Sequence, residues 1–426
     1  MNQANKDQYT KSNFGKWGWS IILYAFLLYY FNTGLSADAM NVIPDAYAGT
    51  YGMDRNLLLS FATPAGIVGV IGGIICGRLC MKTGAKKLSA AALIITGVVF
   101  AIFGSCKTPL TFLLALSVVN FTVNAFGLIA TATLMSNWFP KKKGIALGWA
   151  TMGAPLCSAT FPAILSGLFG SKLGLSGSTV AVGAVIIILG IATLFWVHDY
   201  PEEVGAYPDN IPEDSEMLSA KLDDLKNYKS PLTIGKLLKD KDMWCIALSF
   251  GLMWLVTGGI MSQFVPRLLS VGYTQQSALL MLTIAAAIGL VGSYFWGWLD
   301  QKIGTKPASC VYALSYIGAL LLMVFAQVHI FNYIALVFVG LGIGGLLNLM
   351  PSLVAAVYGR YDFMAANSLV SPIAALIQKG AFALTAILLA KSGGDFTLPY
   401  MVFIGIDILG IVLLLCVTNK CKGKQD

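Results

Sequence analysis

The chain has 426 residues, of which 57% are hydrophobic and 11% are charged, and its mean hydropathy is +0.75. A soluble domain carries about a quarter charged residues, so this composition excludes a soluble globular protein, which would have no way to bury so much apolar surface. The formal net charge is +8, but the basic residues lie in short loops beside apolar stretches rather than on one soluble surface, which excludes a nucleic-acid partner.

Apolar stretches of membrane-spanning length follow one another along almost the whole sequence. A helix needs roughly 20 apolar residues to cross the hydrocarbon core of a bilayer. In chain order, the stretches that meet this requirement are 17–36, 57–78, 88–105, 110–137, 145–169, 180–197, 244–265, 277–299, 308–327, 331–358, 365–390 and 400–417. We therefore predict an all-α membrane protein with twelve transmembrane helices in two pseudo-symmetric six-helix bundles.

One long polar stretch, residues 198–242, divides the chain into two parts. It contains more than half of the acidic residues together with six lysines, and four prolines break it into turns. We expect an amino-terminal bundle over residues 1–197, a cytoplasmic linker over 198–242 and a carboxy-terminal bundle over 243–426. A solvated connector is the simplest interpretation of the linker, and a regulatory or partner-binding role is the alternative.

The distribution of basic residues predicts the orientation in the membrane. Short loops rich in lysine and arginine remain on the cytoplasmic side. Sixteen such residues fall on one side of the predicted helices and five on the other. We expect a multi-pass protein of the cell inner (plasma) membrane with both termini in the cytoplasm. The first apolar stretch follows sixteen mostly polar residues and is of full spanning length, so we expect it to remain as a helix.

The residues needed for enzymatic or metal chemistry are not grouped in the sequence. The eight cysteines are scattered without metal-ligand spacing, and there are two histidines, His198 and His329. The glycine-rich stretches follow no predicted strand, so they do not indicate nucleotide-binding loops. We expect no enzyme activity, no metal, no cofactor and free cysteine thiols.

A short pattern of glycine and lysine occurs after the second helix of each predicted bundle. Its two copies are Gly77, Lys82 and Gly84, and Gly297, Lys302 and Gly304. The same spacing at equivalent places indicates internal duplication. The second glycine of each copy permits a tight reversal of the chain, and the basic residues hold the loop at the membrane surface. We predict that these loops act in gating.

The repeated pattern resembles the signature loop of the major facilitator superfamily, in which two glycines flank an aspartate and a basic residue. Met81 and Gln301 occupy the place of that aspartate, and Asp300 lies one position early, so the chain departs from the family's charge pattern here. The resemblance covers all the predicted helices. It implies a major facilitator fold and a secondary transporter that works by alternating access, in which the two bundles rock about a central site.

A second motif resembles a narrower group within that superfamily. Residues 137–148 read Asn-Trp-Phe-Pro-Lys-Lys-Lys-Gly-Ile-Ala-Leu-Gly and are similar to a loop of the oxalate/formate antiporters and related monocarboxylate transporters. In oxalate-type transporters, a lysine in helix eleven and an arginine in helix eight surround a dicarboxylate. Lys379 stands in helix eleven, but Ser293 stands where the arginine would be. The resemblance therefore favours a substrate with one carboxylate.

Lys379 lies in the middle of a predicted transmembrane helix, about eleven residues from either end. A charge at this depth costs several kcal/mol unless it faces a cavity or a partner, so it marks a functional site, and a lysine stem is too short to reach the membrane surface from here. A compact ammonium in a low-dielectric cavity attracts a carboxylate strongly. We predict that Lys379, beside Gln378, binds an anionic substrate, and internal pairing is the alternative.

Amide and phenol side chains supply further candidates for the same site. Asn120 and Asn124 share one face of helix four, and that face borders either the central pathway or a neighbouring helix, because amides also join helices. The other candidates are Asn32, Gln263, Tyr294 and Asn348. Asp407 in helix twelve is consistent with pairing to a lysine, carrying a proton or facing a peripheral groove, and the sequence does not decide between these roles.

We predict a secondary active transporter that moves a small organic anion, a monocarboxylate, as an exchanger or proton symporter, and that works in the lipid bilayer as a monomer. One alternative is a carrier for larger amphipathic acids, such as bile-acid-like or aromatic acids, or a drug exporter. An alternative from another class is a transporter-like receptor or sensor, whose linker would have to bind a partner.

Overall fold

The computed structural model describes residues 11–212, 215–325 and 329–424, and these residues form helices joined by short loops. Up to the linker, the helices are α2 (Gly15–Ser36), α3 (Ile43–Tyr51), α4 (Arg55–Ser60), α5 (Ala62–Thr83), α6 (Ala85–Phe103), α7 (Pro109–Asn124), the π-helix η2 (Ala125–Ala130), α8 (Thr131–Trp138), α9 (Lys143–Thr151), α10 (Gly153–Phe169) and α11 (Gly174–Trp196). The short 3-10 helix η1 (Asp38–Asn41) follows α2.

The linker and the second half of the chain are helical as well. The linker contains η3 (Pro201–Val204), η4 (Pro208–Asn210), α12 (Ser215–Asn227) and α13 (Ile234–Leu237). The second half contains α14 (Lys241–Ser270), α15 (Gln275–Ile303), α16 (Thr305–Phe325), α17 (His329–Gly342), α18 (Gly345–Gln378), α19 (Ala381–Lys391) and α20 (Thr397–Leu415). The predicted all-α fold is confirmed.

The helices cross the membrane twelve times. The described residues contain eleven helical stretches that are long and apolar enough to span a bilayer, and a shorter apolar helix over Ile330–Gly342. The longest stretch, Gly345–Lys391, changes direction at Gly359, whose φ is 68°. Its first part continues the shorter helix as one pass, and its second part forms the next pass. Glycine suits this reversal because a side chain makes that backbone conformation unfavourable. Helices are required here because lipid offers no partners for backbone N–H and C=O groups.

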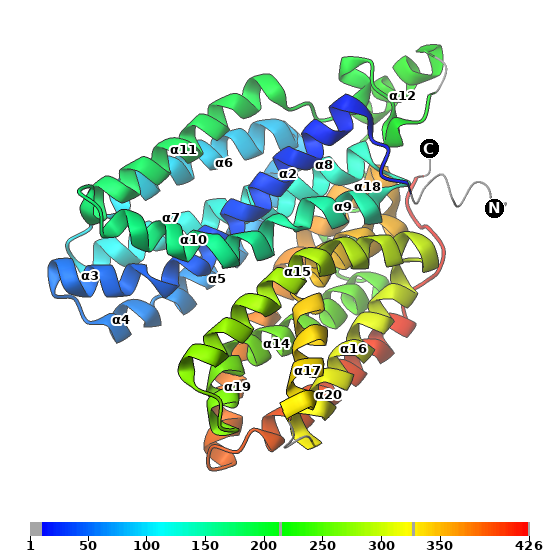
Figure 1. Cartoon of the computed structure of the whole chain (residues 1–426). Helices are drawn as coiled ribbons and strands as arrows, with labels where there is room; N and C mark the ends of the chain where they lie inside the picture. Colours follow the sequence, from blue (N-terminus) through cyan, green and yellow to red (C-terminus); the bar gives the residue numbers. More distant parts are fainter. Residues whose placement is uncertain (1–10, 213–214, 326–328, 425–426) are drawn as a thin grey trace.

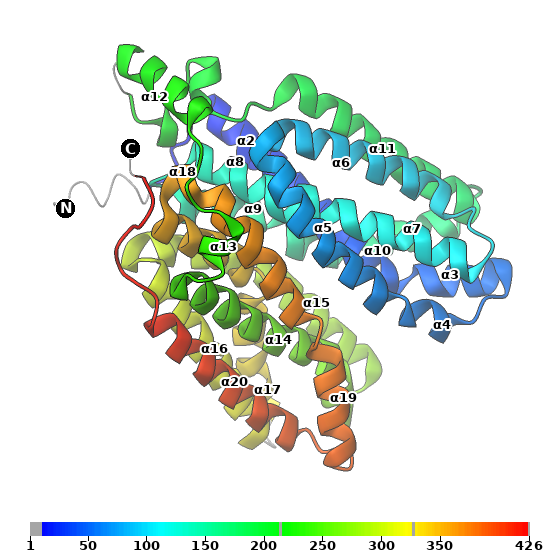
Figure 2. The same ribbon diagram turned by 180° about the vertical axis from the view of Figure 1, so that it is seen from behind.

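The two bundles converge at one end of the molecule and diverge towards the other (Figures 1 and 2). Both ends of the described chain and α12 lie at the converging end, which we call the terminal face; α3, α4 and the end of α19 lie at the opposite end. Helix α9 packs against α15, and α5 packs against α18. These two pairs join one half of the chain to the other.

Glycines allow the backbones of these pairs to approach closely. A Cβ atom on Gly297 in α15 would overlap the carbonyl oxygen of Gly144 in α9. A Cβ atom on Gly77 in α5 would lie 2.5 Å from Cβ of Ser368 in α18, closer than real side chains come. The first glycine of each signature loop therefore lies at the contact between the bundles.

The remaining residues of the signature loops lie at the terminal face. Gly84 ends α5 with a φ of 83°, and Gly304 ends α15 with a φ of 93°, so both second glycines form the tight reversal that the sequence predicts. Lys82 lies in the last turn of α5. Lys302 lies in the last turn of α15, with its ammonium 4.6 Å from the ring centre of Trp298.

Asp300 and Gln301, where the second signature loop departs from the family's charge pattern, also contact the first bundle. Gln301 donates a hydrogen bond from Nε2 to the carbonyl oxygen of Lys141, at 2.7 Å. Asp300 is buried, accepts hydrogen bonds from Thr305 and Ser352, and lies against Gly144. Both residues of this loop thus contact the chain around the start of α9, Gln301 by a hydrogen bond and Asp300 by close packing.

The linker is bound to both bundles rather than hanging free. Asp209 accepts hydrogen bonds from the backbone N–H groups of Lys141 and Lys142, at the start of α9. Burial raises the pKa of the Asp209 carboxyl to about 6, although these hydrogen bonds oppose the rise. Glu202 forms a two-pronged ion pair with Arg360, with N···O distances of 2.9 Å and 3.1 Å.

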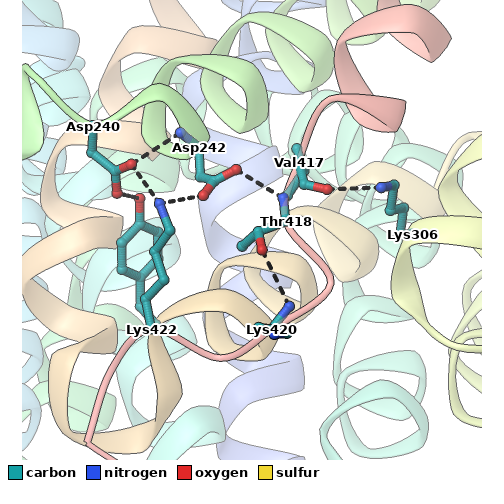
Figure 3. A network of polar contacts seen from close by, with 8 residues as sticks. Asp240, Asp242, Lys306, Val417, Thr418, Lys420 and Lys422 are labelled. Atoms are coloured by element: carbon teal, nitrogen blue, oxygen red, sulfur yellow. Dashed lines mark hydrogen bonds and ion pairs between the residues drawn. The ribbon is translucent and has the colours of Figure 1, made fainter.

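The carboxy-terminal tail crosses the terminal face and contacts the start of α14 (Figure 3). Lys422 pairs with Asp240 at 2.7 Å and also with Asp242. Asp242 accepts a hydrogen bond from the backbone N–H of Thr418 at 2.8 Å, and Lys306 donates to the carbonyl oxygen of Val417 at 2.7 Å. The tail therefore covers the terminal ends of α14 and α16.

We expect Glu202→Gln to lower the free energy of unfolding by about 3–5 kcal/mol, because it leaves the Arg360 charge buried without its partner. The side chains of Arg360 and Glu202 are only 2% and 1% exposed. The measurement is thermal unfolding in detergent. The matched control is Asp45→Asn, which breaks the Arg55–Asp45 pair, whose side chains are 49% and 58% exposed. Equal effects of the two substitutions would contradict this prediction.

Candidate functional site

A cavity of about 230 Å³ lies between the two bundles. Both halves of the chain supply its walls, which combine amides and hydroxyls with apolar side chains. The lining residues are Asn32, Thr33, Ser36, Ala37, Val70, Asn120, Asn124, Leu128, Ala154, Ser158, Trp254, Thr257, Ile343, Leu346, Leu347, Ala375, Gln378 and Lys379. Lys379 is the one residue with a formal charge among them.

Several helices that line this cavity are interrupted beside it. The α-helix of α7 ends at Asn124 and continues as a π-helix through Ala130. A break at Ile343 and Gly344 separates α17 from α18, and a break at Lys379 and Gly380 separates α18 from α19. π-Bulges and helix breaks are common at functional sites because they present irregular backbone to a cavity. The sequence predicts one helix through Lys379; in the structure the regular helical hydrogen bonding is interrupted at Lys379 and Gly380, although both residues keep helical φ and ψ angles.

Lys379 lies between α5 and the end of α18. A Cβ atom added to Gly66 in α5 would lie 3.0 Å from Cε of Lys379. The aliphatic part of the Lys379 side chain therefore packs against α5 at a residue that has no side chain. The side chain is exposed although it belongs to a membrane-spanning segment, because it borders the cavity. Within the described part of the chain, its ammonium forms no ion pair, and the acidic Asp407 is not its partner.

The predicted amides of the first bundle meet at the same cavity. Nδ2 of Asn120 donates to the carbonyl oxygen of Leu116, and Nδ2 of Asn124 donates to that of Asn120, both at 3.0 Å. Each amide retains a second N–H donor. Asn32 packs against Gly127 of the π-helix, where any side chain would overlap its amide. The structure thus brings Asn32, Asn120 and Asn124 together with Gln378 and Lys379.

Three of the predicted site residues lie outside the cavity. Asn348 is fully buried, and its Nδ2 donates to the carbonyl oxygen of Ser293 at 3.4 Å. The ring of Tyr294 lies 4.9 Å from that of Trp149, where α15 meets α9. Gln263 is half-buried in α14 and is not one of the lining residues. Asn348 and Tyr294 thus join neighbouring helices, and Gln263 lies elsewhere along α14.

Sequence reasoning missed the hydroxyl groups of the cavity wall. Thr33, Ser36, Ser158 and Thr257 all line it. The Ser158 hydroxyl donates to Oδ2 of Asp38 at 2.9 Å, and the Thr257 hydroxyl lies 3.2 Å from that of Tyr312. Helical serines and threonines usually bond to their own backbone, as Ser36 does to Asn32, so residue type alone gives no signal for a cavity.

Comparison with known proteins places the chain in a family. A model described as Major Facilitator Superfamily matches residues 21–378. The MFS-type transporter pynF of Aspergillus niger is 27% identical over 139 residues, which cover 33% of this chain and 32% of pynF. Monocarboxylate transporter 9 of Mus musculus is 25% identical over 221 residues, which cover 50% of this chain and 42% of the mouse protein. The alignments therefore span less than half of these two relatives.

A longer alignment is found with a bacterial protein. The uncharacterized MFS-type transporter YhjX of Escherichia coli is 21% identical over 293 residues, which cover 68% of each chain.

Solved structures share the whole fold at low sequence identity. The proton:xylose symporter XylE has a TM-score of 0.73 at 14% identity, over 96% of this chain and 98% of XylE. The human organic anion transporter MFSD10 has a TM-score of 0.66 at 12% identity, over 97% of this chain and 100% of MFSD10. With the family match over residues 21–378 and two helical bundles around a central cavity, the chain belongs to the Major Facilitator Superfamily of membrane transporters.

Proposed function

We propose that this transporter carries a small organic anion, a monocarboxylate, and that Lys379 binds its carboxylate. The observation that carries the proposal is one lysine without an ion-pair partner, at the wall of a cavity between two membrane-embedded bundles. A charge at this depth is costly unless something compensates it. An anionic substrate supplies that compensation, and the attraction becomes strong when the substrate displaces water from the cavity.

The composition of the cavity wall supports a substrate with one carboxylate and a short carbon skeleton. A dicarboxylate would bring two negative charges to a wall with one positive charge. Gln378, Asn120 and Asn124 offer hydrogen-bond donors in the wall that also holds Lys379, while Val70, Leu128, Leu346 and Leu347 offer apolar surface. A volume of about 230 Å³ is small for a bile-acid-like molecule, since drug-sized ligands occupy pockets of about 300–1,000 Å³. The name of the mouse relative, monocarboxylate transporter 9, agrees with this substrate class.

The proposed transport cycle uses the contacts between the bundles. We assign the terminal face to the cytoplasm because the lysine-rich loops after α5, α8 and α15 lie there, and we assign the protein to the plasma membrane. Close contacts at Gly77 and Gly297 join the bundles on that side, so the substrate reaches the cavity from the other side in this conformation. Rocking of the bundles about the cavity would separate these contacts and open the cytoplasmic side.

Replacement of Lys379 tests the proposal directly. We expect Lys379→Met to raise KM for monocarboxylates by about 10-fold to 100-fold, because a hydrogen bond to a charged group is worth about 1.5–3 kcal/mol. Lys379→Arg should retain part of the activity. The measurement is counterflow of labelled lactate in proteoliposomes, with formate, acetate, pyruvate, benzoate, oxalate and cholate as competitors.

The matched control for this experiment is Lys391→Met, at the exposed end of α19, which should transport like the wild type. Unchanged lactate counterflow by Lys379→Met would refute the assignment of Lys379. Preferential competition by cholate or benzoate would favour a carrier of larger acids. Tight binding of an acid without counterflow would favour a receptor.

The amide wall gives a second prediction with a smaller effect. We expect Asn124→Ala to raise KM about 2-fold to 10-fold without loss of stability, because a neutral hydrogen bond contributes about 0.5–1.5 kcal/mol. Tyr294→Phe should leave KM unchanged, since Tyr294 lies outside the cavity. KM and thermal unfolding are measured for both variants. An Asn124→Ala protein with the wild-type KM for every acid would show that this amide only joins helices.

A further inference from the structure

A second, much smaller space lies beside the central cavity. Its volume is about 10 Å³, and its lining residues are Tyr29, Leu128, Ala132, Trp254, Leu347, Met350, Pro351 and Ser371. A void of this size holds at most about one water molecule. Three of these residues, Leu128, Trp254 and Leu347, also line the cavity that contains Lys379. Their side chains therefore separate the two spaces.

The smaller space lies about one helical turn closer to the terminal face than the cavity does. Helix α2 runs away from that face (Figure 1), and Tyr29 precedes the cavity residue Asn32 by about one turn. The membrane-spanning stretch Pro109–Trp138 runs towards the face, and Ala132 follows Leu128 by about one turn. The cavity, the three shared side chains and the smaller space thus follow one another towards the terminal face.

The two bundles are packed together around the smaller space. Ala132 belongs to the first bundle, but it is buried within the apolar core of the second. Leu347 belongs to the second bundle and packs against the apolar cores of both. We call Leu128, Trp254 and Leu347 the cavity floor, because a solute that enters from the opposite end reaches them last in this conformation.

Lys379 lies at the other end of the cavity from this floor. After its change of direction at Gly359, α18 runs away from the terminal face. In this part of the helix, Ser371 lines the smaller space, and Lys379 follows it by about two turns, or about 12 Å. A carboxylate held at Lys379 would therefore have its carbon chain on the side of the floor.

The floor is apolar and bulky. Trp254 is 7% exposed, and Leu128 and Leu347 are half-buried. A carbon chain that lies between Lys379 and these side chains gains affinity with each methylene that it buries. A longer chain would have to displace the indole ring from packed surroundings, and forcing extra volume into a packed core is unfavourable.

We propose that Trp254, together with Leu128 and Leu347, sets the greatest chain length of the acid that this transporter accepts. The proposal rests on the proposed function, because it requires the carboxylate to bind at Lys379. Lys379 selects acids against neutral solutes, and the floor selects short acids against long ones. The two ends of the cavity thus divide the recognition of charge from the recognition of length.

The experiment measures how unbranched acids inhibit the counterflow of labelled lactate in proteoliposomes with full-length protein, at equal buffered pH on both sides. The acids are acetate, butyrate and hexanoate, and the quantity compared is the inhibition constant of acetate divided by that of hexanoate. We expect Trp254→Ala to raise this ratio about 10-fold to 20-fold. A buried methylene contributes about 4-fold in affinity, and the space left by the indole ring admits at least two more methylenes.

Trp244→Ala is the matched control. Trp244 belongs to the same helix, is 37% exposed and is not a lining residue of either space, so this variant should keep the wild-type ratio. If Trp254→Ala does not fold, Leu128→Ala serves instead, with a rise of about 4-fold expected for one more buried methylene. An unchanged ratio in the floor variant, or an equal rise in Trp244→Ala, would overturn the proposal.

The same assay separates this proposal from the proposed function. If the acids inhibit counterflow but the floor variants keep the wild-type ratio, the role of the floor is overturned and the anion function stands. If the wild-type protein shows no lactate counterflow and binds no acid of the series, the anion function is overturned, and the proposal on chain length with it.

Discussion

The low polarisability of the membrane determines where charge is tolerated in this protein. Most charged side chains lie in the loops, the linker and the tail, where they pair with one another or with backbone groups. Lys379 and Asp407 lie within membrane-spanning helices of the carboxy-terminal bundle, and their surroundings differ. Lys379 borders the cavity between the bundles, whereas Asp407 is buried and its Oδ2 atom has no hydrogen-bond partner among the described residues.

The two bundles pack closely at the terminal face and diverge towards the opposite end of the molecule. At the terminal face, glycines in α5, α9 and α15 let the bundles touch through their backbones, and the Arg360–Glu202 pair and the tail reinforce that side. Backbone contact of this kind is rigid and specific, because it leaves no room for side-chain adjustment. In the proposed transport cycle, the same contacts separate when the terminal face opens. In the structure, many small contacts rather than one strong bond hold the two bundles together there.

The cavity lies where helices lose their regularity. The π-helix after Asn124 and the breaks at Ile343 and Lys379 are at its wall. A regular helix satisfies all of its backbone groups and offers only side chains to a substrate, whereas an interrupted helix can also turn a long side chain such as that of Lys379 across a neighbour. The glycines at 66 and 127 give Lys379 and Asn32 the room to do so.

The sequence by itself identified the membrane-spanning helices and placed Lys379 within one of them. Hydropathy and charge are local properties, so a 20-residue apolar stretch or a lysine within one can be recognised without knowledge of its neighbours. Helical spacing also identified the shared face of Asn120 and Asn124. It did not identify which neighbour that face meets, because periodicity defines a direction around one helix only.

Only the tertiary structure decided which polar groups share a cavity. It placed Thr257 and Ser158 at the wall and Asn348 and Tyr294 away from it. It also joined Arg360 to Glu202, which lies 158 positions away in the chain. Such contacts depend on how whole helices are rotated and tilted against one another. That arrangement is the sum of many weak packing interactions between distant segments, and no single stretch of sequence contains it.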